Sequence, residues 1–258
     1  MTWATSCVPY KKVAPKKIPE TDAIFEQLAL VNAEADADAS VLRLSLDAKA
    51  TILIGDYSRG GHSRLIVTAA DHDFQPEEKM TPFGIFLPQY HELYLYFTHS
   101  KVTSDFIVDC LQAFWLTQQD RFPQVKTLLL NLDNGPENHS RRTQFMQRIT
   151  NFVDDFCINV DLAYYPPYHS KYNPIERVWG VLEQHWNGSL LDSCETVLKF
   201  AHTMRYQGQQ PMIQFVQKIY HIGVRLTQAV MAELEKRFVR LSTLPKWFVR
   251  IKPLPHCL

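Results

Sequence analysis

The most informative segment of the chain is Tyr164-Tyr-Pro-Pro-Tyr-His-Ser-Lys-Tyr-Asn-Pro-Ile-Glu-Arg-Val-Trp-Gly-Val-Leu-Glu-Gln-His-Trp186. It begins as a loop, because Pro166 and Pro167 lack backbone donors and restrict the residues before them. A helix is predicted next, since Asn173 is a favoured N-cap residue and Pro174 suits the first helical position. Apolar residues then recur every three or four positions, as on the buried face of an amphipathic helix: Ile175, Val178, Trp179, Leu182 and Trp186.

Glu176 follows this cap at the third helical position, where a carboxylate meets unpaired backbone N–H groups. Helix capping is therefore sufficient to explain this residue. Glu176 also shares a helix face with Glu183, one heptad later, so its carboxylate could instead face solvent or a cation. On this segment alone both interpretations stay open.

Two strand-like apolar runs end in an aspartate. The run Val41–Asp47 alternates apolar and polar residues like a half-buried strand, and Val125–Asp133 is almost continuously apolar, like a central strand. The second run is followed by Asn-Gly-Pro-Glu-Asn, a turn. A carboxylate at the end of a buried strand is costly unless it is paired or coordinates a cation. Together with Glu176, these two aspartates supply the oxygen ligands that Mg²⁺ prefers.

The same residues carry a resemblance to a known family. The three carboxylates, with Leu132-Asp-Asn-Gly-Pro-Glu-Asn138 and Pro166-Pro-Tyr-His-Ser-Lys-Tyr-Asn-Pro-Ile-Glu-Arg-Val-Trp-Gly180, resemble the Asp-Asp-Glu (DDE) transposases of bacterial insertion sequences. The match is to the Rhodopirellula-type transposase DDE domain, a relative of the mariner-like group, and it extends from about Lys16 to Pro253. Further matching stretches are Lys17-Ile-Pro-Glu-Thr-Asp-Ala-Ile-Phe25, Ile54-Gly-Asp-Tyr-Ser-Arg-Gly-Gly61, Ala70-Asp-His-Asp-Phe74, Thr103-Ser-Asp-Phe-Ile-Val-Asp109 and His185-Trp-Asn-Gly188.

The resemblance implies a ribonuclease-H-like fold and metal-dependent cleavage and strand transfer of DNA for an insertion sequence. It implies that Asp47, Asp133 and Glu176 are the catalytic residues and hold two Mg²⁺ ions, for which Mn²⁺ can substitute, with Asp47 bridging both. The implied partners are DNA, at the element ends and at the target, and further copies of the chain on that DNA. We expect the chain to begin inside or just after the family's amino-terminal helix-turn-helix region, and hence to be truncated.

Other interpretations of the site and the function remain open. The chain could be a non-catalytic DNA-binding remnant that keeps the fold, or a metal-dependent nuclease of the same fold acting on RNA–DNA hybrids. Asp56 competes with Asp47 for the first metal position. Asp71, His72 and Asp73 could bind a metal, although alternating polar residues in a loop more often form turns.

Contacts to DNA phosphates are expected from two loops. Gly60 and Gly61 let the backbone approach a ligand closely, and arginines flank them. Three further cationic or imidazole side chains flank Glu176. Ordinary surface exposure explains these residues equally well. The candidates are Arg59, Arg64, His169, Lys171 and Arg177.

The composition of the 258 residues, 46% of them hydrophobic, suits a protein with a substantial core. No apolar run is long enough to cross a bilayer and the start carries no signal pattern, so we expect a soluble, cytoplasmic protein without a membrane partner. The five cysteines have no short spacings, which argues against a disulfide framework or a zinc site. The net charge is zero, but ten Lys and Arg against two Glu from residue 198 onward make a basic tail, suited to phosphate binding or to a solvated helix face.

The order of expected elements is α/β. It predicts a mixed five-stranded sheet with flanking helices and a helical carboxy-terminal tail, similar to the ribonuclease-H-like fold. Residues 35–38 and 56–82 are expected to be loops, and the first two strands a hairpin. The expected domains are an arm with a short helix at 1–40, the catalytic domain at 41–190 and a basic helical extension at 191–258. The expected strands are 41–47, 51–55, 93–98, 125–133 and 158–164, and the expected helices are 21–31, 103–118, 141–156, 173–186, 195–206 and 224–238.

Overall fold

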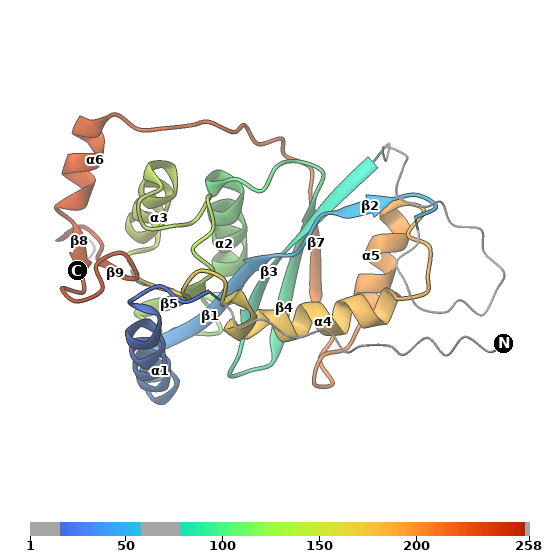
Figure 1. Ribbon diagram of the computed structural model, residues 1–258, viewed down its shortest axis with the longest axis horizontal. Helices are drawn as coiled ribbons and strands as arrows, with labels where there is room; N and C mark the ends of the chain where they lie inside the picture. The colour runs from blue at the N-terminus through green and yellow to red at the C-terminus, as the bar shows by residue number, and fades with distance from the viewer. Residues whose placement is uncertain (1–15, 58–77, 256–258) are drawn as a thin grey trace, which may run out of the picture.

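A mixed β-sheet runs through the molecule (Figure 1). The computed structural model describes residues 16–57 and 78–255. Along the nine-stranded sheet the order is β7-β4-β3-β1-β5-β6-β9-β8, and β2 pairs with β3 beside this path. The pairs β1–β5, β5–β6 and β4–β7 are parallel and the others are antiparallel. The strands are β1 (Val41–Ala48), β2 (Ile52–Ile54), β3 (Glu78–Leu87), β4 (Glu92–Thr98), β5 (Thr127–Leu132), β6 (Asn159–Tyr164), β7 (Met212–Val216), β8 (Phe238–Arg240) and β9 (Phe248–Ile251).

Helices cover both faces of the sheet. Successive residues of β3 show the two faces, since Phe83 packs edge-on against Phe106 of α2 whereas Gly84 faces α4. Helices α2 and α3 lie side by side on the first face (Figure 1). None of the helices in the described ranges is long and apolar enough to cross a membrane. The helices are α1 (Thr21–Ala37), α2 (Ser104–Gln118), α3 (Thr143–Phe156), α4 (Ile175–Trp186), α5 (Cys194–Thr203) and α6 (Gln228–Glu235), with a 3-10 turn, η1, at Ser170–Tyr172.

The parallel pair β1–β5 sets the position of two acidic residues. Its register places Ser45 beside Asn131, so two residues further along each strand Asp47 comes opposite Asp133 on the same face. Every other residue of β1 points to the opposite face, where Leu42, Leu44 and Leu46 are fully buried. The alternating pattern of β1 therefore specifies which face carries the acidic group.

The predicted hairpin between the first two strands is wrong. Strands β1 and β2 do not pair with each other, because both pair antiparallel with β3, β1 along residues 83–86 and β2 along residues 78–80. Residues 49–51 interrupt the strand briefly, and β2 then runs in the same direction as β1. That connection, Lys49-Ala50-Thr51, contains none of the Gly, Asn or Asp residues that favour a two-residue hairpin turn.

Strand β3 begins inside the region expected to be a loop. Pro82 and Gly84 are unfavourable in a strand, since proline lacks a donor and glycine weakens a strand. The carbonyl of Pro82 accepts a hydrogen bond from the Lys49 N–H (2.9 Å), so Pro82 faces the gap between β1 and β2. Its missing donor therefore falls at the break between the two ladders and not inside either of them.

Two other expectations about the elements need correction. Helix α1 does not stop near residue 31 but continues through Ala35 to Ala37, because alanine propagates a helix well. Arg43 of β1 then forms a two-pronged ion pair with Asp36 (2.7 and 2.6 Å). The carboxy-terminal tail is not wholly helical, since β7, β8 and β9 join the two ends of the sheet and α6 is only Gln228–Glu235.

Helix α4 lies unusually close to the sheet at Gly84, which is opposite Asp47 in the β1–β3 ladder. A Cβ atom on Gly84 would be 2.6 Å from Cδ1 of Ile175 and 2.7 Å from the ring of Trp179. Both of these α4 side chains are buried. Only glycine therefore lets α4 pack directly above this part of β1 and β3.

We predict that Gly84→Ala lowers the free energy of unfolding by about 1–3 kcal/mol, because the added methyl forces α4 away from the sheet. Gly180→Ala is the matched control, since a Cβ at this exposed position of α4 meets nothing within 4 Å. Removing a helical glycine should stabilise the control by about 0.5–1 kcal/mol. Urea denaturation of both variants measures the difference, and equal stability of the two would contradict the close approach.

Candidate active site

The three predicted acidic residues come to one end of the central strands. Asp47 lies at the end of β1, Asp133 directly follows β5, and Glu176 is in the first turn of α4, all of them half-buried. Burial, and after it the negative charges of Asp133 and Glu176, raise the pKa of Asp47 to about 7. Asp133 and Glu176 are thus each near enough to repel the charge of Asp47.

The first carboxylate is held by a tryptophan from α4. The indole Nε1–H of Trp179 donates a hydrogen bond to Oδ2 of Asp47 (2.9 Å), and this bond opposes the rise in the pKa of Asp47. Trp179 lies three residues after Glu176, so one helical turn supplies both groups. The sequence pattern assigned Trp179 only to the apolar stripe. The indole N–H, which usually finds an acceptor when tryptophan is buried, could have indicated its second role.

The second carboxylate is held by the turn that follows β5. Oδ1 of Asp133 accepts hydrogen bonds from the Gly135 N–H (3.1 Å) and from the side-chain amide of Asn138 (2.8 Å). The buried hydroxyl of Tyr164 fixes this turn by donating to the carbonyl of Asn138 (2.7 Å). No hydrogen bond from the described residues reaches Oδ2 of Asp133, which leaves that oxygen for another ligand.

Helix α4 is anchored to β1 by a buried polar pair. The hydroxyl of Ser45 donates to Oδ1 of Asn173 (2.5 Å) and accepts from the N–H of Ile175 (3.1 Å), and the Asn173 amide donates to the carbonyl of Leu46 (3.2 Å). Ser45 and Asn173 are both almost completely buried. Asn173 therefore does not cap the helix as predicted. The hydroxyl of Ser45, on β1, accepts the hydrogen bond from the first turn of α4 instead, and Asn173 connects the preceding loop to β1.

Capping does not account for Glu176. No hydrogen bond to its carboxylate is found within residues 16–57 and 78–255, and the interaction that is seen is the repulsion with Asp47. Glu183, one heptad later, forms an ion pair with Lys49 (2.6 Å) beyond the end of β1. The two glutamates thus have different surroundings on the same helix.

The three carboxylates are not packed as one tight group. In the described part of the chain, a different set has three ligand atoms within 4.8 Å of one another, namely Glu78, His99 and Cys194.

The other predicted site residues fall into three groups. Arg59, Arg64, Asp71, His72 and Asp73 lie outside the described residues. Asp56, the alternative to Asp47 for the first metal position, is exposed just after β2. Asp47, in contrast, feels the charges of the other two carboxylates. Lys171 and Arg177 are exposed beside the start of α4.

His169 is only 4% exposed, although it was a candidate for DNA contact. Its Nδ1 atom is 2.7 Å from the carbonyl of Pro167, and its ring packs against Phe25 of α1 and Tyr172. These contacts fit a structural role in holding the loop before α4 against α1 better than a contact to phosphate.

The basic tail is partly neutralised within the chain. Six of its ten cationic residues form ion pairs, three of them with aspartates of the body, Asp109, Asp154 and Asp161. Two of the other pairs use the tail's own Glu233 and Glu235, which the surplus already counts, so about half of the surplus charge is compensated by carboxylates outside the tail. The paired residues are Lys199, Lys218, Lys236, Arg237, Arg240 and Arg250.

Comparison with known families identifies the domain. The model of the Rhodopirellula transposase DDE domain matches residues 7–253. The chain belongs to this family. The fold agrees with the predicted ribonuclease-H-like arrangement of a mixed sheet between helices, although the sheet has nine strands where five were expected. Among curated proteins no match is found.

Solved structures similar to this transposase domain are complexes of the mariner transposase Mos1. They include a paired-end complex with Mn (TM-score 0.51), a paired-end complex with the left transposon end (TM-score 0.52) and a strand transfer complex (TM-score 0.50), each at 12% identity. This chain is covered over 76% of its length, but it spans only 58%, 58% and 57% of the respective Mos1 chains. At this identity the likeness shows the fold.

We predict that Asp47→Asn stabilises the metal-free transposase domain at neutral pH. The pKa of Asp47 is raised from its ordinary value to about 7, so its contribution to stability is fully present below about pH 4 and is lost as the pH rises through 7. At about 1.4 kcal/mol per pKa unit, the gain of the variant over wild type should grow over this window to at most about 4 kcal/mol.

Thermal unfolding between pH 4 and pH 8 measures this gain, with Asp56→Asn as the control. Asp56 is exposed and should show no such pH-dependent gain. If Asp56→Asn were stabilised as much as Asp47→Asn or more, then residue 56, and not residue 47, would be the carboxylate whose ionisation destabilises the fold.

Proposed function

We propose that this transposase domain cleaves DNA and transfers the cut strand, with Asp47, Asp133 and Glu176 holding the divalent metal ions that the reaction needs. The observation that carries this proposal is that the half-buried carboxylate of Asp47 on β1 is repelled by the charges of Asp133, which follows β5, and Glu176, which lies in the first turn of α4. Such an arrangement is unfavourable for the fold by itself, and perturbed acidic groups of this kind gather at functional sites.

The residues present suit Mg²⁺ or Mn²⁺. All three donors are carboxylate oxygens, Oδ2 of Asp133 is not engaged by a hydrogen bond from the described residues, and a cation would relieve the repulsion around Asp47. Asp47 is influenced by both of the other carboxylates, and we infer that it would be the ligand shared by two ions. When bound, such a pair stabilises both the attacking and the leaving oxygen of an in-line phosphoryl displacement.

The protein contributes rigid positioning to this reaction. Trp179 fixes the orientation of the Asp47 carboxylate, and Asn138 fixes that of Asp133. The anchor between Ser45 and Asn173 sets where α4 starts, and therefore where Glu176 stands relative to β1. Ligands held by neighbouring side chains in this way need little rearrangement when metal and substrate bind.

The comparisons support DNA as the substrate. The family is one of transposase domains, and the Mos1 structures with the same fold are complexes with transposon ends and a strand transfer complex, one of them with Mn. Lys171 and Arg177 are exposed and flank Glu176, and we propose that they contact DNA phosphates. Assembly of further copies on the DNA ends belongs to the same proposal.

We predict that the wild-type chain nicks supercoiled plasmid DNA only when Mg²⁺ or Mn²⁺ is present. Asp133→Asn and Glu176→Gln should each reduce the nicking rate at least about a hundredfold, more than loss of a group that merely supports a metal ligand. The matched control is Glu183→Gln, on the same helix but paired with Lys49, which should nick at nearly the wild-type rate.

The same assay separates the other candidate functions. Nicking that survives in Asp133→Asn and Glu176→Gln would remove these residues from the site. A folded wild-type chain that binds DNA without metal-dependent nicking would identify a non-catalytic remnant. Preferential cleavage of an RNA–DNA hybrid in competition with duplex DNA would identify a hybrid-specific nuclease.

A further inference from the structure

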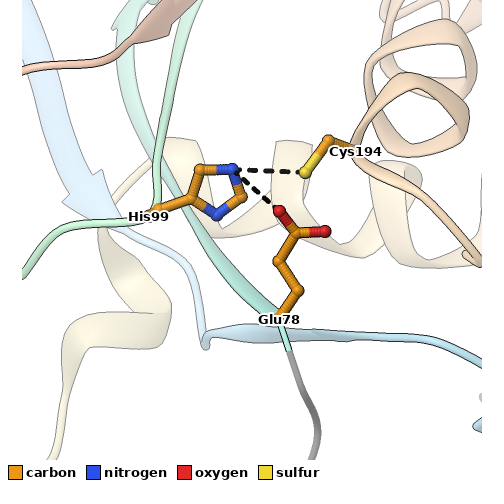
Figure 2. A group of neighbouring side chains, drawn as sticks. All are labelled: Glu78, His99 and Cys194. Carbon is orange, nitrogen blue, oxygen red and sulfur yellow. Dashed lines mark hydrogen bonds and ion pairs between the residues drawn. The ribbon is translucent and has the colours of Figure 1, made fainter.

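A second group of possible metal ligands lies apart from the three carboxylates. Glu78 is the first residue of β3, His99 directly follows β4, and Cys194 is the first residue of α5. Figure 2 shows the Glu78 carboxylate and the Cys194 thiol both directed at one nitrogen of the His99 ring. That nitrogen, Nε2, is 3.2 Å from the Cys194 sulfur and 3.5 Å from Oε1 of Glu78, and all three ligand atoms lie within 4.8 Å of one another.

We propose that Glu78, His99 and Cys194 bind a zinc ion. Thiolate and imidazole ligands select zinc over the hard cations Mg²⁺ and Ca²⁺, which prefer oxygen. With zinc–ligand bonds of about 2.0–2.3 Å at a tetrahedral angle, neighbouring ligand atoms stand roughly 3.3–3.6 Å apart. The two distances from Nε2 are close to this edge length, so only a small rearrangement is needed to admit the ion, with water in the fourth position.

The histidine is already oriented for metal binding. Its other nitrogen, Nδ1, is 2.7 Å from the backbone carbonyl of Lys79, to which an Nδ1–H donates. That bond leaves the lone pair of Nε2 free for a metal, and it is the arrangement usual for zinc-bound histidines. The His99 ring also packs edge-on against Phe215 of β7, with ring centroids 5.1 Å apart, which restricts its rotation.

A nucleophilic cysteine explains this group less well. An activated cysteine needs a neighbouring histidine free to act as its base and a thiol with a lowered pKa. Here the Glu78 carboxylate shares the near nitrogen of His99 with the thiol. Burial and Glu78 raise the pKa of the metal-free Cys194 thiol to about 11, so the thiol is not activated, whereas a coordinating zinc would deprotonate it.

The site would act as a brace for the fold. It joins the start of β3 and the end of β4, which are consecutive paired strands, to the beginning of α5, 95 residues after His99. Helix α5 packs against α4, which carries Glu176. The absence of short cysteine spacings, which argued against zinc, concerns ligands in one local motif, and this group draws one ligand from each of three elements.

Cobalt(II) titration of the full chain tests the proposal, because cobalt replaces zinc and absorbs near 350 nm only when a thiolate binds it. The absorption should saturate at about one cobalt ion per chain. The wild type should show this band. Cys194→Ser should lose it and His99→Asn should weaken cobalt binding at least tenfold. The matched control is Cys157→Ser, which removes an exposed free cysteine and should keep the band.

Alkylation of the wild-type chain provides a test that needs no variant. Zinc should slow the reaction of Cys194 at least tenfold and leave that of Cys157 unchanged, as read by peptide mass spectrometry. A missing cobalt band in the wild type, a band that survives in folded Cys194→Ser, or equal alkylation of Cys194 with and without zinc would each overturn the proposal.

Discussion

The attachment of α4 to β1 is the constraint on which the rest of the structure depends. It combines the buried pair of Ser45 and Asn173 with the bond from the Trp179 indole to Asp47. Gly84 makes it possible, because any larger residue there would collide with α4. Both parts of this attachment join segments more than a hundred positions apart in the chain. Through them a helix that begins after a proline-rich loop delivers Glu176 to the end of the central strands.

This attachment holds together groups that repel one another. The neighbouring carboxylates raise the pKa of Asp47, and such repulsion in a half-buried place costs stability that packing elsewhere must offset. The buried apolar stripe of α4 and the leucines on the opposite side of β1 supply that packing. A site that is unfavourable when empty and favourable with cations is a common compromise between stability and function.

The sequence predicted the parts of the molecule in which local pattern and burial agree. The strands that carry Asp47 and Asp133 and the helix that carries Glu176 were all expected, since each has a clear period. Strand β3 was not expected in full because Pro82 and Gly84 are unfavourable in a strand. Whether a strand accepts them depends on residues distant in the sequence, here Lys49 opposite Pro82 and α4 above Gly84. The pairing of β1 and β2 with β3, and the strands of the carboxy-terminal segment, were likewise decided by contacts distant in sequence.

The same distinction applies to the candidate site. The acidic residues could be named from strand ends and from the family resemblance, but the groups that hold them could not. Trp179 and Asn138 show their roles only through their hydrogen bonds to the two aspartates, and the identity of a residue does not reveal which partner it will meet. The sequence likewise could not show how the charge of the basic tail is used, because three of its six ion pairs are made with aspartates on the body of the protein.

Anomalous diffraction from crystals of the full chain soaked in Mn²⁺ tests the central claim most directly, because it locates the ions without relying on activity. Our account predicts manganese peaks bounded by the carboxylates of Asp47, Asp133 and Glu176, with Asp47 nearest to both if two ions bind. Manganese at Asp56 or elsewhere, with Glu176 directed into solvent and no peak among the three carboxylates, would contradict it.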